Sequence, residues 1–119
     1  MRAKKGERVF DSLTLSALPA EDEALRAPLR ALIEAAIRDR PPHQRARSWQ
    51  GFDAEFSRAL GQAGYLGLTL PKAYGGAERG PFARFVVVEE LLSAGAPVAA
   101  HWIADRQSGP LILNYGTEA

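Results

Sequence analysis

Two adjacent glutamates, Glu89 and Glu90, are the first candidates for chemistry, because paired carboxylates can act as general acid and general base. Both lie in an apolar stretch with helical spacing, and neighbouring positions on a helix point about 100° apart. The two carboxylates therefore do not converge on one substrate atom. We expect one of them to be solvated and the other to be paired or hydrogen-bonded at the domain boundary.

A second group lies near the C-terminal end, where His101, Trp102, Asp105 and Arg106 bring an imidazole, an indole and two charges together. Trp102 and Arg106 are four residues apart, so they share one face of a helix. A hydrogen-bonded structural role and a role in proton transfer are both open for His101. Trp102 is equally consistent with core packing and with a pocket wall.

The segment Tyr74-Gly75-Gly76 suggests a phosphate-binding loop at first sight. Such a loop follows a strand and runs directly into the N-terminus of a helix. Here the glycines precede another loop and no Lys-Ser or Lys-Thr pair follows them. We therefore favour a tight turn over a phosphate site.

The chain has 119 residues, 46% of them hydrophobic and 24% charged, which is the size and balance of one globular domain. Fifteen Lys and Arg against 14 Asp and Glu leave a formal net charge of +1, so neither nucleic acid nor a membrane surface is expected as a partner. Cysteine is absent, and His43 and His101 do not cluster with other ligands, so no metal site is predicted. No apolar run approaches the roughly 18–20 residues of a membrane span, and residues 1–8 lead into no signal core, so we expect a cytoplasmic protein.

Helical periodicity predicts an all-α fold, a small orthogonal bundle of about four helices. The first helix is expected over residues 20–40, with a kink or a restart at Pro28, because proline costs about 3 kcal/mol inside a helix. Ser48 is the predicted N-cap of a second helix, which ends at Gly64. Residues 65–80 show no helical period.

A third helix, apolar over more than half of its circumference, is predicted to begin at Pro81 and to stop at Gly95. A fourth begins near Val98, falters at residues 108–110 and continues to Gly116. The predicted core draws on all four helices and consists of Leu25, Leu29, Ile33, Phe52, Phe56, Leu60, Phe85, Val86, Leu92 and Leu111.

Residues 1–18 form a basic N-terminal tail that we expect to be flexible or loosely docked, and residues 19–119 form the domain. At the other end, Thr117 and Glu118 have the types of an N-cap and an acidic first turn, directly before the sequence stops at Ala119. We therefore expect the natural polypeptide to continue into a further helix.

Three spaced segments together resemble the signatures of one family. Residues 61–76 read GQAGYLGLTLPKAYGG, with a Gly-aromatic pair, a Gly-Leu step, a proline and a Tyr-Gly-Gly turn. Glu89-Glu90-Leu91 follows on the third helix, and GPLIL and YGTE stand within residues 109–118. In this order and spacing the segments are similar to the N-terminal helical domain of the acyl-CoA dehydrogenase family, over about residues 20–119.

The resemblance implies a longer enzyme, in which this α-domain precedes a β-domain and a C-terminal four-helix bundle. In the family these later parts hold FAD. A glutamate of the C-terminal part removes the proton alpha to the thioester, while hydride passes from the beta carbon to the flavin. The implied activity is an oxidoreductase of fatty acid metabolism that desaturates an acyl-CoA.

The same resemblance implies no catalytic residue and no FAD-binding residue in this chain, which we expect to be inactive and free of flavin by itself. The implied partners are acyl-CoA, the remaining domains of the enzyme and further copies of the same chain. Two alternatives stay open. One is a flavin monooxygenase of the same fold, with His101 assisting, and the other is a non-catalytic helical interaction module.

In the family, the start of the last helix lines the floor of the acyl pocket. Carried over by position relative to Pro110, this role falls to Val98, Trp102 and Arg106. His101 is a further candidate on the same helix. Because Trp102 and Arg106 are unusual walls for a long hydrocarbon chain, we expect a short, branched or polar acyl group, or a pocket completed in another way.

Overall fold

The structure is a computed structural model that describes residues 15–118, and every regular element in this part of the chain is helical. This confirms the predicted all-α class. Most of the predicted tail, residues 1–14, lies outside the described residues, as does Ala119. The elements are α1 (Ala20–Glu23), α2 (Arg26–Ile37), α3 (Pro42–Arg45), η1 (Ser48–Gln50), α4 (Ala54–Gln62), η2 (Lys72–Tyr74), α5 (Pro81–Ala94), α6 (Ala99–His101), the π-helical η3 (Trp102–Ser108) and α7 (Gly109–Tyr115).

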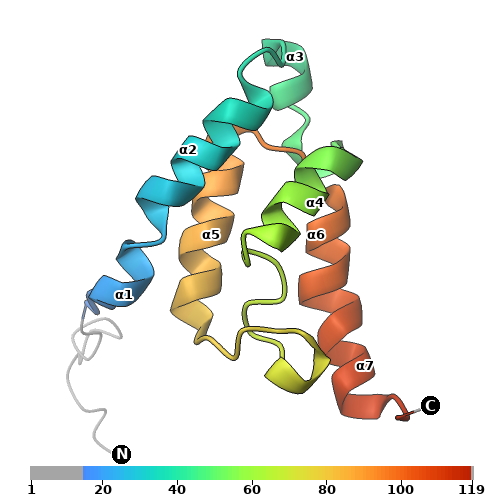
Figure 1. Ribbon diagram of the computed structural model, residues 1–119. Helices are drawn as coiled ribbons and strands as arrows, with labels where there is room; N and C mark the ends of the chain where they lie inside the picture. Colours follow the sequence, from blue (N-terminus) through green and yellow to red (C-terminus); the bar gives the residue numbers. More distant parts are fainter. Residues whose placement is uncertain (1–14, 119) are drawn as a thin grey trace, which may run out of the picture.

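The longer helices form a small bundle, which Figure 1 shows in outline. α2 and α5 run side by side in the same direction. α4 and the α6–η3–α7 helix share one direction too, which is opposite to that of α2 and α5. The core lies where α2, α4 and α5 meet, and its buried members from these helices are Leu29, Ile33, Ile37, Phe56, Leu60, Val87 and Leu91. None of the helices among residues 15–118 is long and apolar enough to cross a membrane.

The first predicted helix is divided into α1 and α2 by a turn at Ala24 and Leu25. Pro28 is the third residue of α2, where its missing N–H removes no hydrogen bond from the helix. The helix therefore restarts just before the proline, as the sequence predicted, and it ends at Ile37.

The second predicted helix begins later than expected, at Ala54, so the predicted N-cap at Ser48 is wrong. Asp53 caps α4 instead, because its Oδ1 accepts a hydrogen bond from the Phe56 N–H at 2.9 Å. The Ser48 hydroxyl is buried and donates to the carbonyl of Ala96, which ties η1 to the segment after α5.

Glycines end α4 and α5 at the predicted positions, since Gly64 has a φ of +79° and Gly95 a φ of +71°. Beyond Gly64, the Tyr65 N–H donates to the Leu60 carbonyl at 3.0 Å, and the Tyr65 ring is buried. α5 begins at Pro81, as the sequence predicted.

Three residues of the predicted core are exposed instead, with exposed fractions of 65% for Phe52, 51% for Phe85 and 59% for Leu111. Phe52 lies in the extended segment before α4, not on the buried face of that helix. Phe85 projects from the side of α5 that faces away from the core. Leu111 lies on α7, which extends beyond the bundle in Figure 1 and has no buried residue.

The last helix is continuous from α6 to α7 but changes its period at η3. The Gly109 N–H bonds to the carbonyl of Ala104, five residues earlier, as in a π-helix. Pro110 has no N–H to donate to the carbonyl of Arg106, so a regular α-helical pattern cannot pass this point. The predicted disturbance at residues 108–110 is thus a wide helical turn and not a break.

Candidate functional site

A cavity lies between α5, the start of the last helix and the loop that follows α4. Its volume is about 50 Å³, and it opens to solvent beside the half-exposed Trp49 and the exposed Arg106. The four residues singled out from the sequence, Val98, His101, Trp102 and Arg106, all belong to its lining. The remaining lining residues are Trp49, Tyr65, Leu66, Leu68, Arg84, Val87, Val88, Leu91, Leu92 and Asp105.

Two tryptophans and an arginine build one side of this cavity. The rings of Trp49 and Trp102 meet edge to face, with centroids 4.5 Å apart and planes at 78°. The guanidinium carbon of Arg106 lies 4.7 Å from the centroid of the Trp102 ring, so the cation is held over the indole face. The spacing of Trp102 and Arg106 predicted their shared face, whereas nothing in the sequence indicated that Trp49 would join them.

His101 connects the cavity to α4. Its side chain is buried, and Nε2 lies 2.8 Å from the Ser57 hydroxyl. The other ring nitrogen, Nδ1, has no hydrogen-bond partner among the described residues. Burial lowers the pKa of His101, and the nearby Asp105 only partly offsets this. The imidazole is therefore a neutral, buried group at neutral pH with one unsatisfied nitrogen.

Asp105 fixes the loop after α4 against η3. Both of its carboxylate oxygens lie 3.2 Å from the Gly67 N–H, which donates to them. Beyond this anchor the loop folds on itself: the Ala77 N–H bonds to the Gly67 carbonyl at 3.2 Å, and the Arg79 N–H bonds to the Leu68 carbonyl at 2.7 Å. The loop residues that line the cavity are thereby held in place by the last helix.

The Tyr74-Gly75-Gly76 segment is a tight turn, as the sequence predicted. Gly75 has a φ of +83°, and a Cβ on Gly76 would lie 2.1 Å from the Leu70 carbonyl oxygen. The turn therefore requires glycine for backbone reasons, and it does not run directly into a helix N-terminus as a phosphate loop would.

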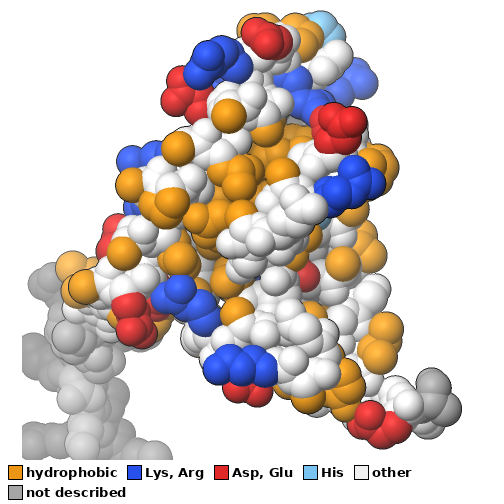
Figure 2. Space-filling model, in the orientation of Figure 1, with side chains coloured by type: hydrophobic (Ala, Val, Ile, Leu, Met, Phe, Trp, Pro, Cys, Tyr) orange, Lys and Arg blue, Asp and Glu red, His pale blue; other side chains and the backbone are white. Residues whose placement is uncertain are grey.

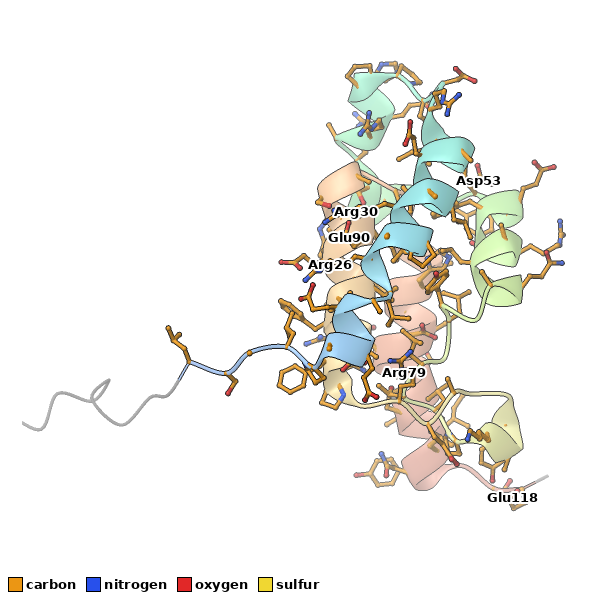
Figure 3. All side chains as sticks on the ribbon, turned by 60° about the vertical axis from the view of Figure 1, so that its left-hand side comes forward. Arg26, Arg30, Asp53, Arg79, Glu90 and Glu118 are labelled. Atoms are coloured by element: carbon orange, nitrogen blue, oxygen red, sulfur yellow. The ribbon has the colours of Figure 1, made fainter. Side chains whose placement is uncertain are left out.

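Glu90 faces α2 and not the cavity. It is 5% exposed and accepts hydrogen bonds from Arg26 Nη1 at 2.7 Å and from Arg30 Nε and Nη2 at 2.5 and 2.7 Å (Figure 3). Glu89 is 49% exposed and lies 2.6 Å from Arg26. The bonds from Arg30, supported by Arg26, hold the pKa of Glu90 below its usual value despite its burial. Glu90 is thus the paired carboxylate and Glu89 the more solvated of the two, as expected, although Glu89 also pairs with Arg26.

Residues 15–118 contain no cluster of metal ligands, and the cavity beside the last helix is small. No group of three His, Cys, Asp or Glu side chains among residues 15–118 is placed to hold a metal ion. The cavity of about 50 Å³ is far below the ~300–1,000 Å³ of typical ligand pockets, so the isoalloxazine of FAD does not fit into it. We therefore derive no flavin step from these residues.

Comparison with known proteins gives a consistent family match. The model of the acyl-CoA dehydrogenase N-terminal domain matches residues 19–119. The chain is 36% identical over 96 residues to the probable acyl-CoA dehydrogenase fadE25 of Mycobacterium leprae, covering 76% of this chain and 22% of that protein. It is 33% identical over 65 residues to the acyl-CoA dehydrogenase FadE12 of Mycobacterium tuberculosis, covering 55% of this chain and 17% of that protein.

A solved structure extends the likeness to the fold. The chain superposes on the ChsE4-ChsE5 complex from Mycobacterium tuberculosis with a TM-score of 0.65 and 28% identity, over 89% of this chain and 26% of that one. The chain thus spans about a quarter or less of the length of these relatives.

Proposed function

Since the chain belongs to the acyl-CoA dehydrogenase family through its N-terminal domain, we propose that it serves as one wall of the acyl pocket in an FAD-dependent acyl-CoA dehydrogenase. In that enzyme it packs on the β-domain and contributes no group to proton or hydride transfer. FAD would be the hydride acceptor. It would be held by other parts of that enzyme, those that correspond to the rest of the relatives' length.

The observation that carries this proposal is the apolar cavity beside the last helix. Six aliphatic side chains of α5 and the loop line it, and Val98 and Trp102 close it from the last helix. Its small volume supports a wall and not a complete pocket, because an acyl chain needs further surface to be covered.

The bulk of Trp102 favours a restricted acyl group. The indole is held between Trp49 and the Arg106 guanidinium, so it is fixed in place beside the cavity. A fixed ring of this size shortens the space that a straight hydrocarbon chain could occupy. We infer that the whole enzyme prefers short or polar acyl groups over long ones.

The test uses the complete natural protein. Acyl-CoA thioesters of increasing chain length are compared by the rate at which each bleaches the visible absorption of the flavin. Replacing Trp102→Ala enlarges the cavity, and we expect kcat/KM for long acyl groups to rise relative to short ones by roughly tenfold, the scale of a few methylenes in an apolar pocket. Arg58→Gln, on the exposed face of α4, is the control and leaves the preference unchanged.

An unchanged chain-length preference in Trp102→Ala would contradict the proposal that the last helix forms part of the acyl-pocket wall. A whole protein that purifies without flavin, or a flavin that no acyl-CoA bleaches, would overturn the dehydrogenase assignment itself.

A further inference from the structure

Two arginines at the mouth of the cavity have no acidic partner among the residues that the structure describes. Arg84 comes from α5 and Arg106 from η3, and both line the apolar cavity and the open groove next to it. Neither side chain forms a salt bridge or donates a hydrogen bond within residues 15–118. Two elements that are distant in sequence thus direct two free cations to one place.

The carboxylates around this place are already engaged. Asp105, the only acid in the cavity lining that the structure describes, accepts the Gly67 N–H with both oxygens. Glu89, in the adjoining groove, pairs with Arg26 at 2.6 Å. The cavity mouth therefore combines two arginines that form no ion pair among residues 15–118 with one carboxylate that is hydrogen-bonded to the backbone, and an anion placed between the arginines gains their attraction.

The geometry also prepares these groups for binding. Stacking on the Trp102 ring holds the Arg106 guanidinium in one orientation, which lowers the entropy lost when it binds a ligand. A guanidinium fork matches the two oxygens of a carboxylate better than any other side chain does.

An apolar wall with a cationic mouth fits an amphipathic acid. We propose that the cavity takes an acyl group whose far end carries a carboxylate, with the hydrocarbon part against Val98, Trp102 and Leu91 and the carboxylate bound by Arg84 and Arg106. The substrate class of the proposed dehydrogenase is then the monothioester of a dicarboxylic acid. This inference rests on the proposed function, because it assumes that the cavity is the acyl wall.

The test compares the binding of two probes to the full 119-residue chain, and nuclear magnetic resonance detects the binding. Two probes are used, the N-acetylcysteamine thioester of hexanoic acid and the N-acetylcysteamine monothioester of hexanedioic acid. Neither probe carries a phosphate, so the charge of coenzyme A makes no contribution. The indole N–H signals of Trp49 and Trp102 and the Nε–H signals of Arg84 and Arg106 report the binding site.

We expect the hexanedioic probe to bind at least about tenfold more tightly, which is the scale of one charge-assisted hydrogen bond. Arg84→Gln and Arg106→Gln each reduce this preference, Arg106→Lys keeps part of it, and Arg58→Gln on exposed α4 leaves it unchanged. The spectra of the variants show directly whether each one is folded. Raised salt weakens the preference without affecting the hexanoic probe.

The outcomes separate the two proposals. Equal binding of both probes, or a preference that survives both Gln substitutions, overturns the carboxylate inference and leaves the acyl wall standing. If free coenzyme A shifts the two arginine signals and the two probes bind equally, the arginines bind phosphate, and the carboxylate inference is overturned. If neither probe shifts any of the four signals at saturating concentration, the carboxylate inference falls, whereas the acyl wall is tested separately by Trp102→Ala in the whole protein.

Discussion

Glu90 shows at the scale of single residues how the domain stabilises a buried charge. Its carboxylate is 5% exposed and accepts three hydrogen bonds from two arginines of α2 (Figure 3). Removing an arginine from such a network leaves the buried carboxylate with fewer donors, which costs more than the net value of the pair. This contact is therefore the main polar link between α2 and α5.

The first prediction follows from that link. Glu90→Gln should lower the free energy of unfolding in urea by about 1–3 kcal/mol, because the amide satisfies fewer of the arginine donors. Glu89→Gln is the matched control, since that side chain is 49% exposed, and it should change the free energy of unfolding by about 0.5 kcal/mol or less. Equal effects of both substitutions would contradict the assignment of Glu90 as the buried partner.

His101 gives a prediction for the pH dependence of stability. Burial lowers its pKa below 6.5, so in acid the unfolded chain binds a proton more readily than the folded domain does. The contribution of His101 is therefore full above pH 6.5, the pKa of a free histidine, and decreases as the pH falls below it. His101→Gln, unfolded in urea over this range, should remove the decrease, whereas an unchanged slope would show that another group causes it.

At the scale of elements, η3 decides where the site residues point. The wide turn depends on a bond from the Gly109 N–H to the Ala104 carbonyl, and a Cβ on Gly109 would lie 2.7 Å from that same oxygen. The π-helical segment contains Trp102, Asp105 and Arg106, which are the residues that build the cavity wall and anchor the loop. Segments of this kind are frequent at functional sites.

A pair of glycine substitutions tests the requirement at η3. Gly109→Ala should destabilise the domain by roughly 1–3 kcal/mol and disturb the signals of Trp102, because the backbone oxygen cannot move away cheaply. Gly61→Ala, in α4, meets only Leu66 at 3.7 Å and should stabilise the domain by up to about 1 kcal/mol. Loss of stability in both variants, or in neither, would contradict this distinction.

Several elements were predictable because their signals are local. Pro81 starts α5 and Gly64 and Gly95 end their helices through backbone preferences that act at one residue. Ser48 and Asp53 are equally good caps by type, and only the buried bond from Ser48 to Ala96 explains which one is used. That bond joins segments 48 residues apart, so local pattern could not show it.

The candidate site likewise contains residues that local signals predicted and residues that they did not. Helical spacing placed Trp102 and Arg106 on one face, and the resemblance added Val98. The partners from elsewhere in the chain, Trp49 and Arg84, were not predicted because their proximity depends on how α5 and η1 pack against the last helix. The stacking of Arg106 on Trp102 follows from the four-residue spacing, whereas the lack of an acidic partner for Arg106 within residues 15–118 is visible only in the structure.

At the scale of the whole molecule, several large apolar side chains among residues 15–118 are exposed. Apolar side chains reach the surface between α2 and α4 (Figure 2), and α7 exposes 59% of Leu111, 64% of Ile112 and 82% of Tyr115. Exposed apolar patches of this kind mark surfaces that other chains or domains bury. In our proposal, the remaining domains of the enzyme cover α7.

The isolated chain should therefore self-associate. We expect light scattering to show oligomers that increase with concentration, and Leu111→Gln combined with Ile112→Gln to shift the distribution toward monomer. Ala35→Gln, on the exposed side of α2, is a control of the same kind that should not change the distribution. A clean monomer of the unmodified chain at high concentration would contradict this account of α7.

The most direct test of the acyl wall is to observe where an acyl chain lies on this domain. Nuclear Overhauser effects are measured between the acyl protons of hexanoyl-CoA and the side chains of the 119-residue protein. The account predicts contacts to Val98, Leu91 and Trp102, which line the cavity, and none to Leu29 in the core. Contacts confined to Leu111 and Ile112 on α7, or no contacts at saturating ligand, would contradict it.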